Sequence, residues 1–98
     1  MNRRIVFRSE ASQDVEASLQ YYSTVRNGLA TLFLRRLNEV IDRLSARPES
    51  YGFVENPVRA ARVRQFSYVV YYRFDVDRIE ILAVVHSSRD PQTWQSRS

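Results

Sequence analysis

The sequence predicts an α+β fold in which an antiparallel helical hairpin packs on one face of a small, mainly antiparallel sheet. Two amphipathic helical stretches occupy the first half of the chain, and three runs rich in β-forming residues occupy the second half. The apolar stripes of the helices have to be buried, and the apolar face of the sheet is the surface that can cover them. The chain of 98 residues fits one domain, which we expect to span residues 1–98.

The first half of the chain predicts a strand followed by two helices. Residues 3–8 are typical of a short strand because β-branched and aromatic side chains lie at their centre. Over residues 9–25, apolar side chains recur at steps of three and four, which is the helical period. Gly28 ends this helix, a second apolar stripe runs over residues 29–44, and Pro48 stops the second helix. The short turn between the helices makes them an antiparallel hairpin.

The second half of the chain predicts a loop over residues 49–58 and three strands, over residues 61–66, 68–74 and 79–86. Short connections make these strands antiparallel neighbours, so the expected element order is β-α-α-β-β-β, ending in a three-stranded meander. The tail, residues 87–98, is expected to be irregular or to form a short helical turn. In this arrangement the sheet face opposite the helices stays open.

Composition narrows the possible chemistry. The chain has no cysteine, which excludes disulfides, thiolate catalysis and cysteine-based metal centres. It has neither a signal peptide pattern nor an apolar run of membrane-spanning length, so we expect a cytoplasmic protein with no membrane partner. It also lacks a glycine-rich phosphate loop and a cluster of metal-ligating residues, and we therefore expect no cofactor and no metal.

The basic side chains are all arginines, and they suggest an acidic partner. The net charge is +4, and all fifteen basic residues are arginines. Arg59, Arg62, Arg64 and Arg73 lie in a stretch that has no Asp or Glu. Arg62 and Arg64 are two residues apart on a predicted strand and so point to the same face, opposite Val63. These arginines either bind phosphates or carboxylates on the open sheet face, or they form an ordinary solvated face. Codon bias is an alternative explanation for the use of arginine in place of lysine.

Three residues near the end of the chain are further candidates. His86 is the only histidine, and it could act as a general acid or base or be a structural residue. Arg89 follows it closely in the sequence, and an arginine of the stretch over residues 57–74 could supply the positive charge that phosphoryl chemistry needs. Trp94 could stack on a base or a partner, or it could pin the tail to the sheet.

Several motifs stand in an order and spacing typical of one known family. The first helix carries the pair Tyr21-Tyr22. More specific are residues 62–73, Arg-Val-Arg-Gln-Phe-Ser-Tyr-Val-Val-Tyr-Tyr-Arg, and residues 79–91, Ile-Glu-Ile-Leu-Ala-Val-Val-His-Ser-Ser-Arg-Asp-Pro. The likeness covers nearly the whole chain, which resembles the RelE/ParE superfamily of type II toxins and lies nearer to its ParE-like, plasmid-stabilisation branch.

The resemblance implies a toxin that is neutralised by a cognate antitoxin. In this family a flexible segment of the antitoxin folds as it wraps around the toxin. The resemblance therefore implies a hetero-oligomer that binds operator DNA only through the antitoxin complex. No cofactor is implied.

The family has two kinds of target. RelE-like members cleave messenger RNA on the ribosome, and the matching positions here are Arg62, Arg64, His86 and Arg89. The chain departs from the nuclease pattern because it has no lysine, and because Trp94 stands where the nuclease tyrosine is expected. ParE-like members inhibit DNA gyrase. The leading hypothesis is gyrase inhibition by protein binding, and the alternatives are a ribosome-dependent mRNA endonuclease and a degenerate toxin that only regulates.

Overall fold

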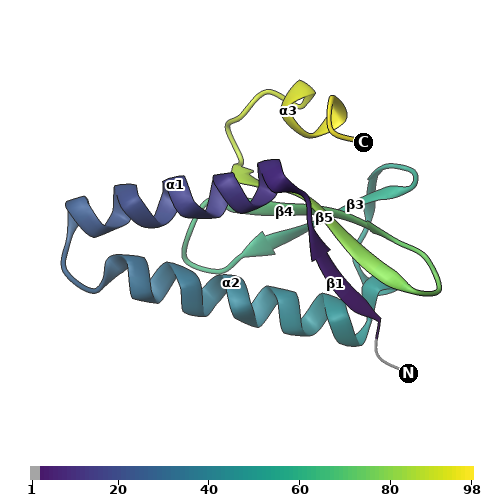
Figure 1. Cartoon of the computed structure of the whole chain (residues 1–98), viewed down its shortest axis with the longest axis horizontal. Helices are drawn as coiled ribbons and strands as arrows, with labels where there is room; N and C mark the ends of the chain where they lie inside the picture. Colours follow the sequence, from purple (N-terminus) through teal and green to yellow (C-terminus); the bar gives the residue numbers. More distant parts are fainter. Residues whose placement is uncertain (1–2) are drawn as a thin grey trace.

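A computed structural model describes residues 3–98 as two long helices, a five-stranded sheet and a short C-terminal helix (Figure 1). The elements in chain order are β1 (Arg4–Phe7), α1 (Ser9–Val25), α2 (Leu29–Ala46), the 3-10 helix η1 (Pro48–Ser50), β2 (Phe53–Glu55), β3 (Val58–Val63), β4 (Tyr68–Phe74), β5 (Arg78–His86) and α3 (Gln92–Gln95). The α+β class and the helical hairpin on one sheet face are confirmed. None of the helices over residues 3–98 is both long and apolar enough to cross a membrane.

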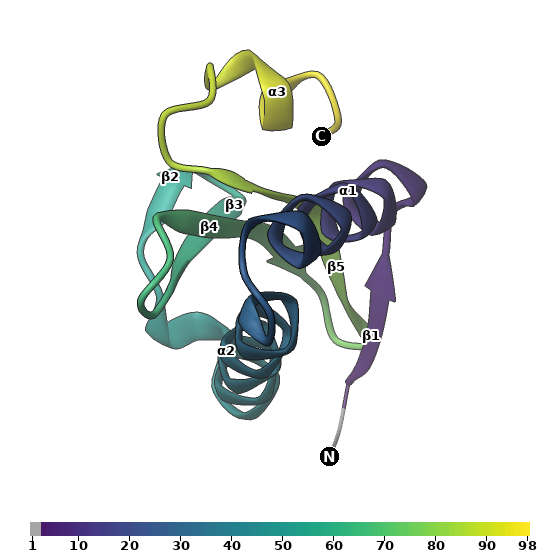
Figure 2. The same cartoon turned by 90° about the vertical axis from the view of Figure 1, so that its left-hand side faces the viewer.

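The five strands lie in the order β1-β5-β4-β3-β2, and the sheet is mixed. β1 runs parallel to β5, whereas the other neighbours are antiparallel. The parallel pair is short and joins only Arg4–Phe7 to Arg78–Ile81. It forms because the helical hairpin carries the chain back across the sheet before the meander begins, as Figure 2 shows with α1 and α2 on the same side of the strands.

The helical hairpin covers what we call the helix face of the sheet. From α2, Phe33, Leu37, Val40 and Leu44 are fully or almost fully buried, and their spacing of three and four residues places them on one side of the helix. Gly28 joins the two helices with a φ of 85°, a left-handed conformation that glycine adopts without strain. The sequence pattern predicted both helices to within two residues at their ends.

The segment before β3 differs from its prediction. Residues 49–58, expected to be a loop, contain η1 and the short strand β2, which pairs with β3. β3 begins three residues earlier than expected and ends at Val63, so Phe66 lies in the turn and packs its ring against Phe33 at 5.1 Å. A three-residue edge strand is too short to be predicted from its sequence pattern. It is ordered by its pairing with β3.

The opposite side of the sheet, which we call the tail face, is partly covered by the C-terminal segment. Trp94 of α3 is buried and stacks on Tyr71 of β4, with ring centroids 5.2 Å apart and planes inclined by 18°. Val58, Leu82, Ala83 and Val85 complete this small cluster. The expectation of an open face is therefore wrong at its centre, because the aromatic side chain of the tail closes over it.

Candidate functional site

The four arginines that were predicted to share one surface are divided between the two faces. Side chains alternate along β3, and Ala61 and Val63 belong to the core beneath the helices. Arg59 therefore points to the helix face and Arg62 to the tail face. The prediction of one arginine-lined surface is wrong. Arg59 and Arg62 stand at positions of β3 whose side chains point to opposite faces, and Arg64 lies in the turn after the strand.

Arg59 has a structural environment. Its Nη1 donates hydrogen bonds to the carbonyl oxygens of Tyr51, at 2.5 Å, and Glu49, at 3.2 Å. Its guanidinium also lies 3.8 Å from the centre of the Phe53 ring. These contacts hold the end of η1 and β2 against the sheet, and the two hydrogen bonds occupy the N–H groups of Nη1.

Arg64 lies beyond the end of β3, where the strand alternation no longer fixes its direction. Its Nη2 is 3.9 Å from Oε1 of Glu39 on α2. The expectation that Arg62 and Arg64 point to the same face is wrong, because the chain turns after Val63 and carries Arg64 toward the helices.

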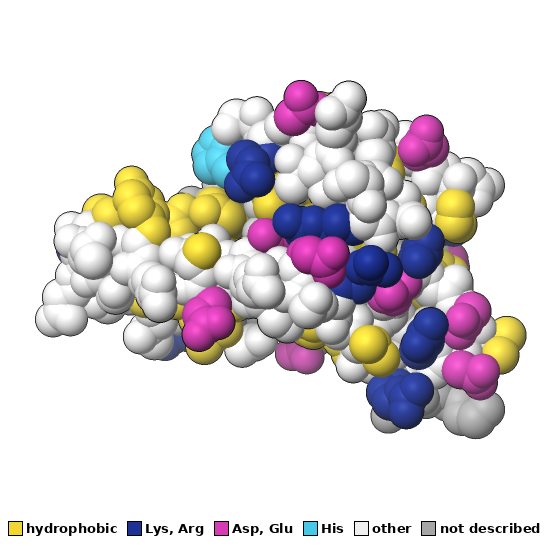
Figure 3. All heavy atoms as spheres, turned by 45° about the horizontal axis from the view of Figure 1, so that its top comes forward, with side chains coloured by type: hydrophobic (Ala, Val, Ile, Leu, Met, Phe, Trp, Pro, Cys, Tyr) yellow, Lys and Arg dark blue, Asp and Glu magenta, His cyan; other side chains and the backbone are white. Residues whose placement is uncertain are grey.

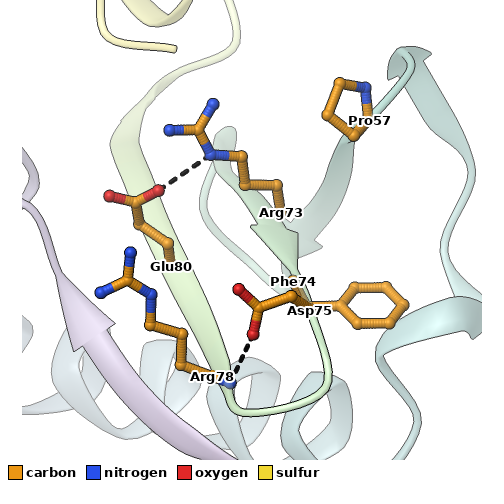
Figure 4. Close-up of a pocket in the computed structure, with 6 residues that line it drawn as sticks. All are labelled: Pro57, Arg73, Phe74, Asp75, Arg78 and Glu80. Carbon is orange, nitrogen blue, oxygen red and sulfur yellow. Dashed lines mark hydrogen bonds and ion pairs between the residues drawn. The ribbon is translucent and has the colours of Figure 1, made fainter.

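Arg73 lies on the tail face and is paired with an acid that the sequence reasoning missed. Its Nε donates to Oε1 of Glu80 on β5 at 2.8 Å, and Arg8 reaches the same carboxylate at 3.6 Å. Figure 4 shows this pair beside Arg78 and Asp75 in a pocket of about 240 Å³. The two acids reduce the positive charge of this pocket, and the Arg73–Glu80 register on neighbouring strands is the signal that could have predicted the pair.

His86 ends β5 on the helix face, opposite Tyr68 of β4, and the two rings meet edge to face at 5.7 Å. The backbone N–H of Ser88 donates to Nδ1 of His86 at 3.1 Å. A backbone N–H can only donate, so Nδ1 accepts and the neutral ring carries its proton on Nε2. In this geometry the exposed Nε2 is a hydrogen-bond donor and lacks the lone pair that a general base needs.

A narrow polar cleft, which we call the α1–β5 cleft, lies next to His86. It has a volume of about 170 Å³ and is lined by Asp14, Ala17, Ser18, Tyr68, Val84, Val85 and Arg89. Ser18 is buried; its Oγ lies 3.1 Å from the Tyr68 hydroxyl oxygen and donates to the Asp14 carbonyl oxygen at 2.9 Å. The cleft thus joins one side of α1 to the ends of β4 and β5.

Asp14 at this cleft also holds the tail in place. Arg97 donates to both of its carboxylate oxygens, from Nη1 at 2.6 Å and from Nη2 at 3.3 Å. The same Nη1 donates to the carbonyl oxygen of Leu82, and Asp14 accepts the backbone N–H of Val84 at 3.1 Å. The pairing of β5 with β1 ends at Ile81. Beyond this residue, the side chains of Asp14 and Arg97 make the hydrogen bonds to the edge of β5 that a neighbouring strand would otherwise make.

Two tyrosines, one half-buried and one fully buried, have pKa values raised to about 12. Burial, together with the neighbouring Tyr68, raises the pKa of Tyr22 to about 12. Burial also raises the pKa of Tyr72 to about 12, and its hydroxyl donates to the carbonyl oxygen of Pro48 at 2.6 Å. Both phenols are therefore neutral and serve as packing and hydrogen-bonding groups.

The residues predicted for a nuclease do not come together around one site. Arg62 and Arg64 both line a pocket of about 470 Å³ at the β3–β4 turn, although Arg64 also approaches Glu39 of α2. His86 and the α1–β5 cleft lie on the helix face and do not belong to this pocket. Only Arg89 lines the cleft beside His86. The Trp94 ring is stacked on Tyr71. Within residues 3–98, no group of three or more His, Cys, Asp or Glu side chains could hold a metal ion.

Comparison with known proteins agrees with the resemblance seen in the sequence. The family model of the ParE toxin of type II toxin-antitoxin system, parDE, matches residues 5–91. No curated protein matches the chain. A solved structure described as the chromosomal ParDE TA system from P. aeruginosa is similar in fold, with a TM-score of 0.72 and 18% identity over 86% of this chain and 95% of that chain. Because the family model spans most of the sequence, the chain belongs to the ParE toxin family of type II toxin-antitoxin systems.

Proposed function

We propose that this chain inhibits DNA gyrase by binding to it and that a cognate antitoxin neutralises this activity. The observation that carries the proposal is the dispersal of the nuclease residues. Cleavage of RNA through its 2′-hydroxyl needs a base, an acid and a cation around one phosphate. Here Arg62 points away from His86, and the imidazole has the tautomer of a donor. A binding mechanism requires none of these groups to converge.

Membership of the family and the fold similarity to a ParDE system support an antitoxin partner. We infer a hetero-oligomer of toxin and antitoxin, in which the antitoxin supplies the contact with operator DNA. The net charge of +4 favours an acidic antitoxin segment. Gyrase and the antitoxin are both cytoplasmic in this proposal, so the toxin acts in the cytoplasm.

The test is a supercoiling assay with purified gyrase, relaxed plasmid and ATP, to which the full chain is added. We expect loss of supercoiling and accumulation of gyrase-cleaved linear DNA, and we expect prior mixing with the antitoxin to prevent both. In parallel, translating ribosomes with a defined messenger RNA are incubated with the same protein. Unimpaired supercoiling together with cleaved messenger RNA would overturn the proposal in favour of the endonuclease.

A further inference from the structure

We propose that the α1–β5 cleft binds the carboxylate of an Asp or Glu side chain from a partner protein, with Arg89 and His86 as its donors. This inference does not depend on which protein the toxin inhibits. It concerns a part of the molecule different from the arginine-rich stretch of β3 and β4. Three properties of the cleft and its border lead to it: an unpaired cation in the lining, the N–H group of His86 beside the lining residue Tyr68, and an apolar border.

The first property is the free charge of Arg89. Its side chain lines the cleft, but within residues 3–98 its guanidinium takes part in no ion pair or side-chain hydrogen bond. The acid that lines the same cleft, Asp14, already accepts two hydrogen bonds from Arg97 and one from the backbone of Val84. Because Asp14 is satisfied by these partners, Arg89 has its five donors available for an external acceptor.

The second property is the fixed direction of the histidine donor. The Ser88 N–H holds Nδ1 of His86 as an acceptor, and the Tyr68 ring packs against the side of the imidazole. The backbone N–H of Arg89 also donates to the carbonyl oxygen of His86 at 3.0 Å, which closes a tight turn. This turn keeps the two side chains on the same short segment, so a planar acceptor with two oxygens can engage Nε2–H and the guanidinium together.

The third property distinguishes a protein carboxylate from a nucleic-acid phosphate. Tyr21 and Val25 of α1 are 61% and 53% exposed, and they extend the half-buried aromatic surface of Tyr22 and Tyr68. Figure 3 shows the histidine at the surface between an arginine and this apolar area. Exposed tyrosine beside arginine is typical of protein interfaces. A phosphate backbone instead needs a row of cations, whereas Arg89 is the one cation among the residues that line this cleft.

The test is a titration of the 15N-labelled full chain, followed by NMR, with a capped Leu-Leu-Glu-Leu-Leu peptide and its Gln counterpart. We expect the Glu peptide to shift the amide signals of Ser88 and Arg89 and the imidazole signal of His86. The Gln peptide should bind about tenfold more weakly, since it loses a charged hydrogen bond. Arg89→Gln should reduce the affinity for the Glu peptide by about tenfold and His86→Ala by several-fold.

Arg62→Gln is the matched control, because Arg62 is also an exposed arginine but lies on the tail face. It should leave the affinity for the Glu peptide unchanged. A circular dichroism spectrum for each variant checks that the fold is retained. Equal affinity for the Glu and Gln peptides would overturn the proposal. So would a single-stranded oligonucleotide that shifts the same signals and is not displaced by the Glu peptide, which would indicate a phosphate site.

Discussion

The two faces of the sheet are buried by different means. On the helix face, two long helices cover a continuous core that contains Phe33, Leu44 and Tyr72. On the tail face, one short helix covers a small cluster through Trp94, and Arg97 ties the segment to Asp14. The helix face is held by many contacts spread over two long elements, whereas the cover of the tail face depends on two side chains.

This difference predicts that a substitution in the core of the helix face destabilises the whole fold, whereas a substitution in the tail has a local effect. A cavity beneath the helices weakens every element that shares the core, because the buried side chains there pack on one another. Loss of an anchor in the tail releases α3 while the helices and strands remain folded. Measurements that separate global unfolding from release of the tail therefore test the comparison directly.

The largest expected effect is on the helix face. Phe33→Ala removes a fully buried ring that contacts the rings of Tyr22, Phe66 and Tyr68, and it should lower the free energy of unfolding by about 4 kcal/mol. Urea denaturation followed by circular dichroism measures the change. Leu34→Ala, at a partly exposed neighbouring position, is the control and should cost less than half as much. Equal losses in the two variants would contradict the core described above.

Trp94→Ala should produce a smaller and more local effect. It removes the ring stacked on Tyr71, and we expect a loss of about 2–3 kcal/mol, limited by the free energy with which the tail is held. Hydrogen exchange should accelerate over residues 92–97 and remain slow in β4. Gln95→Ala, at an exposed position of the same helix, is the control. If exchange accelerates equally across the whole sheet, the tail and the helix face form one cooperative unit and the contrast between them disappears.

The second anchor of the tail is electrostatic. Asp14→Asn keeps a side-chain oxygen for the Val84 N–H but leaves the mostly buried Arg97 without its counter-ion, which should cost about 2 kcal/mol. Trp94 is the only tryptophan, so its fluorescence reports whether the tail is docked. We expect a shift of the emission maximum toward that of exposed tryptophan. Glu16→Gln, on an exposed part of α1, should leave the emission unchanged.

The smallest expected effect concerns a single hydrogen bond of the helix face. Tyr72→Phe removes the hydroxyl that donates to the Pro48 carbonyl and should lower the free energy of unfolding by about 1 kcal/mol. Tyr21→Phe, on the exposed side of α1, is the control and should have no measurable effect. A stability equal to wild type for Tyr72→Phe would mean that this hydrogen bond adds nothing beyond packing.

The same tyrosine gives the fold a pH dependence at alkaline pH. Its pKa rises from 10.0 to about 12 on folding, so the folded state retains the proton more strongly than the unfolded state. The stabilisation is fully present below pH 10 and is lost as the pH rises toward 12. Because the chain has no lysine, tyrosines dominate titration in this range. Tyr72→Phe should therefore flatten the decline of the melting temperature between pH 10 and 12, and Tyr22 should account for part of what remains.

The contrast between the faces also explains what the sequence could predict. The helices and the strands β4 and β5 follow from periodicity, because their side chains repeat the same kind of contact over many residues. β2 could not be predicted, since a strand of three residues depends on its pairing with β3. For the tail, pinning by Trp94 was one of two predictions, and only its stacking on the distant Tyr71 decides between them. The direction of Arg64 was missed because it depends on where β3 ends, and a boundary is the least certain part of a pattern.

The pairing of Asp14 with Arg97 has a consequence for association between molecules. A strand edge with free N–H and C=O groups can pair with a strand of another molecule and so promotes aggregation. Beyond Ile81, the carboxylate of Asp14 and the guanidinium of Arg97 engage such groups of β5. The ion pair thereby shields this border from intermolecular strand pairing, and the protein should become more prone to self-association when Arg97 is removed.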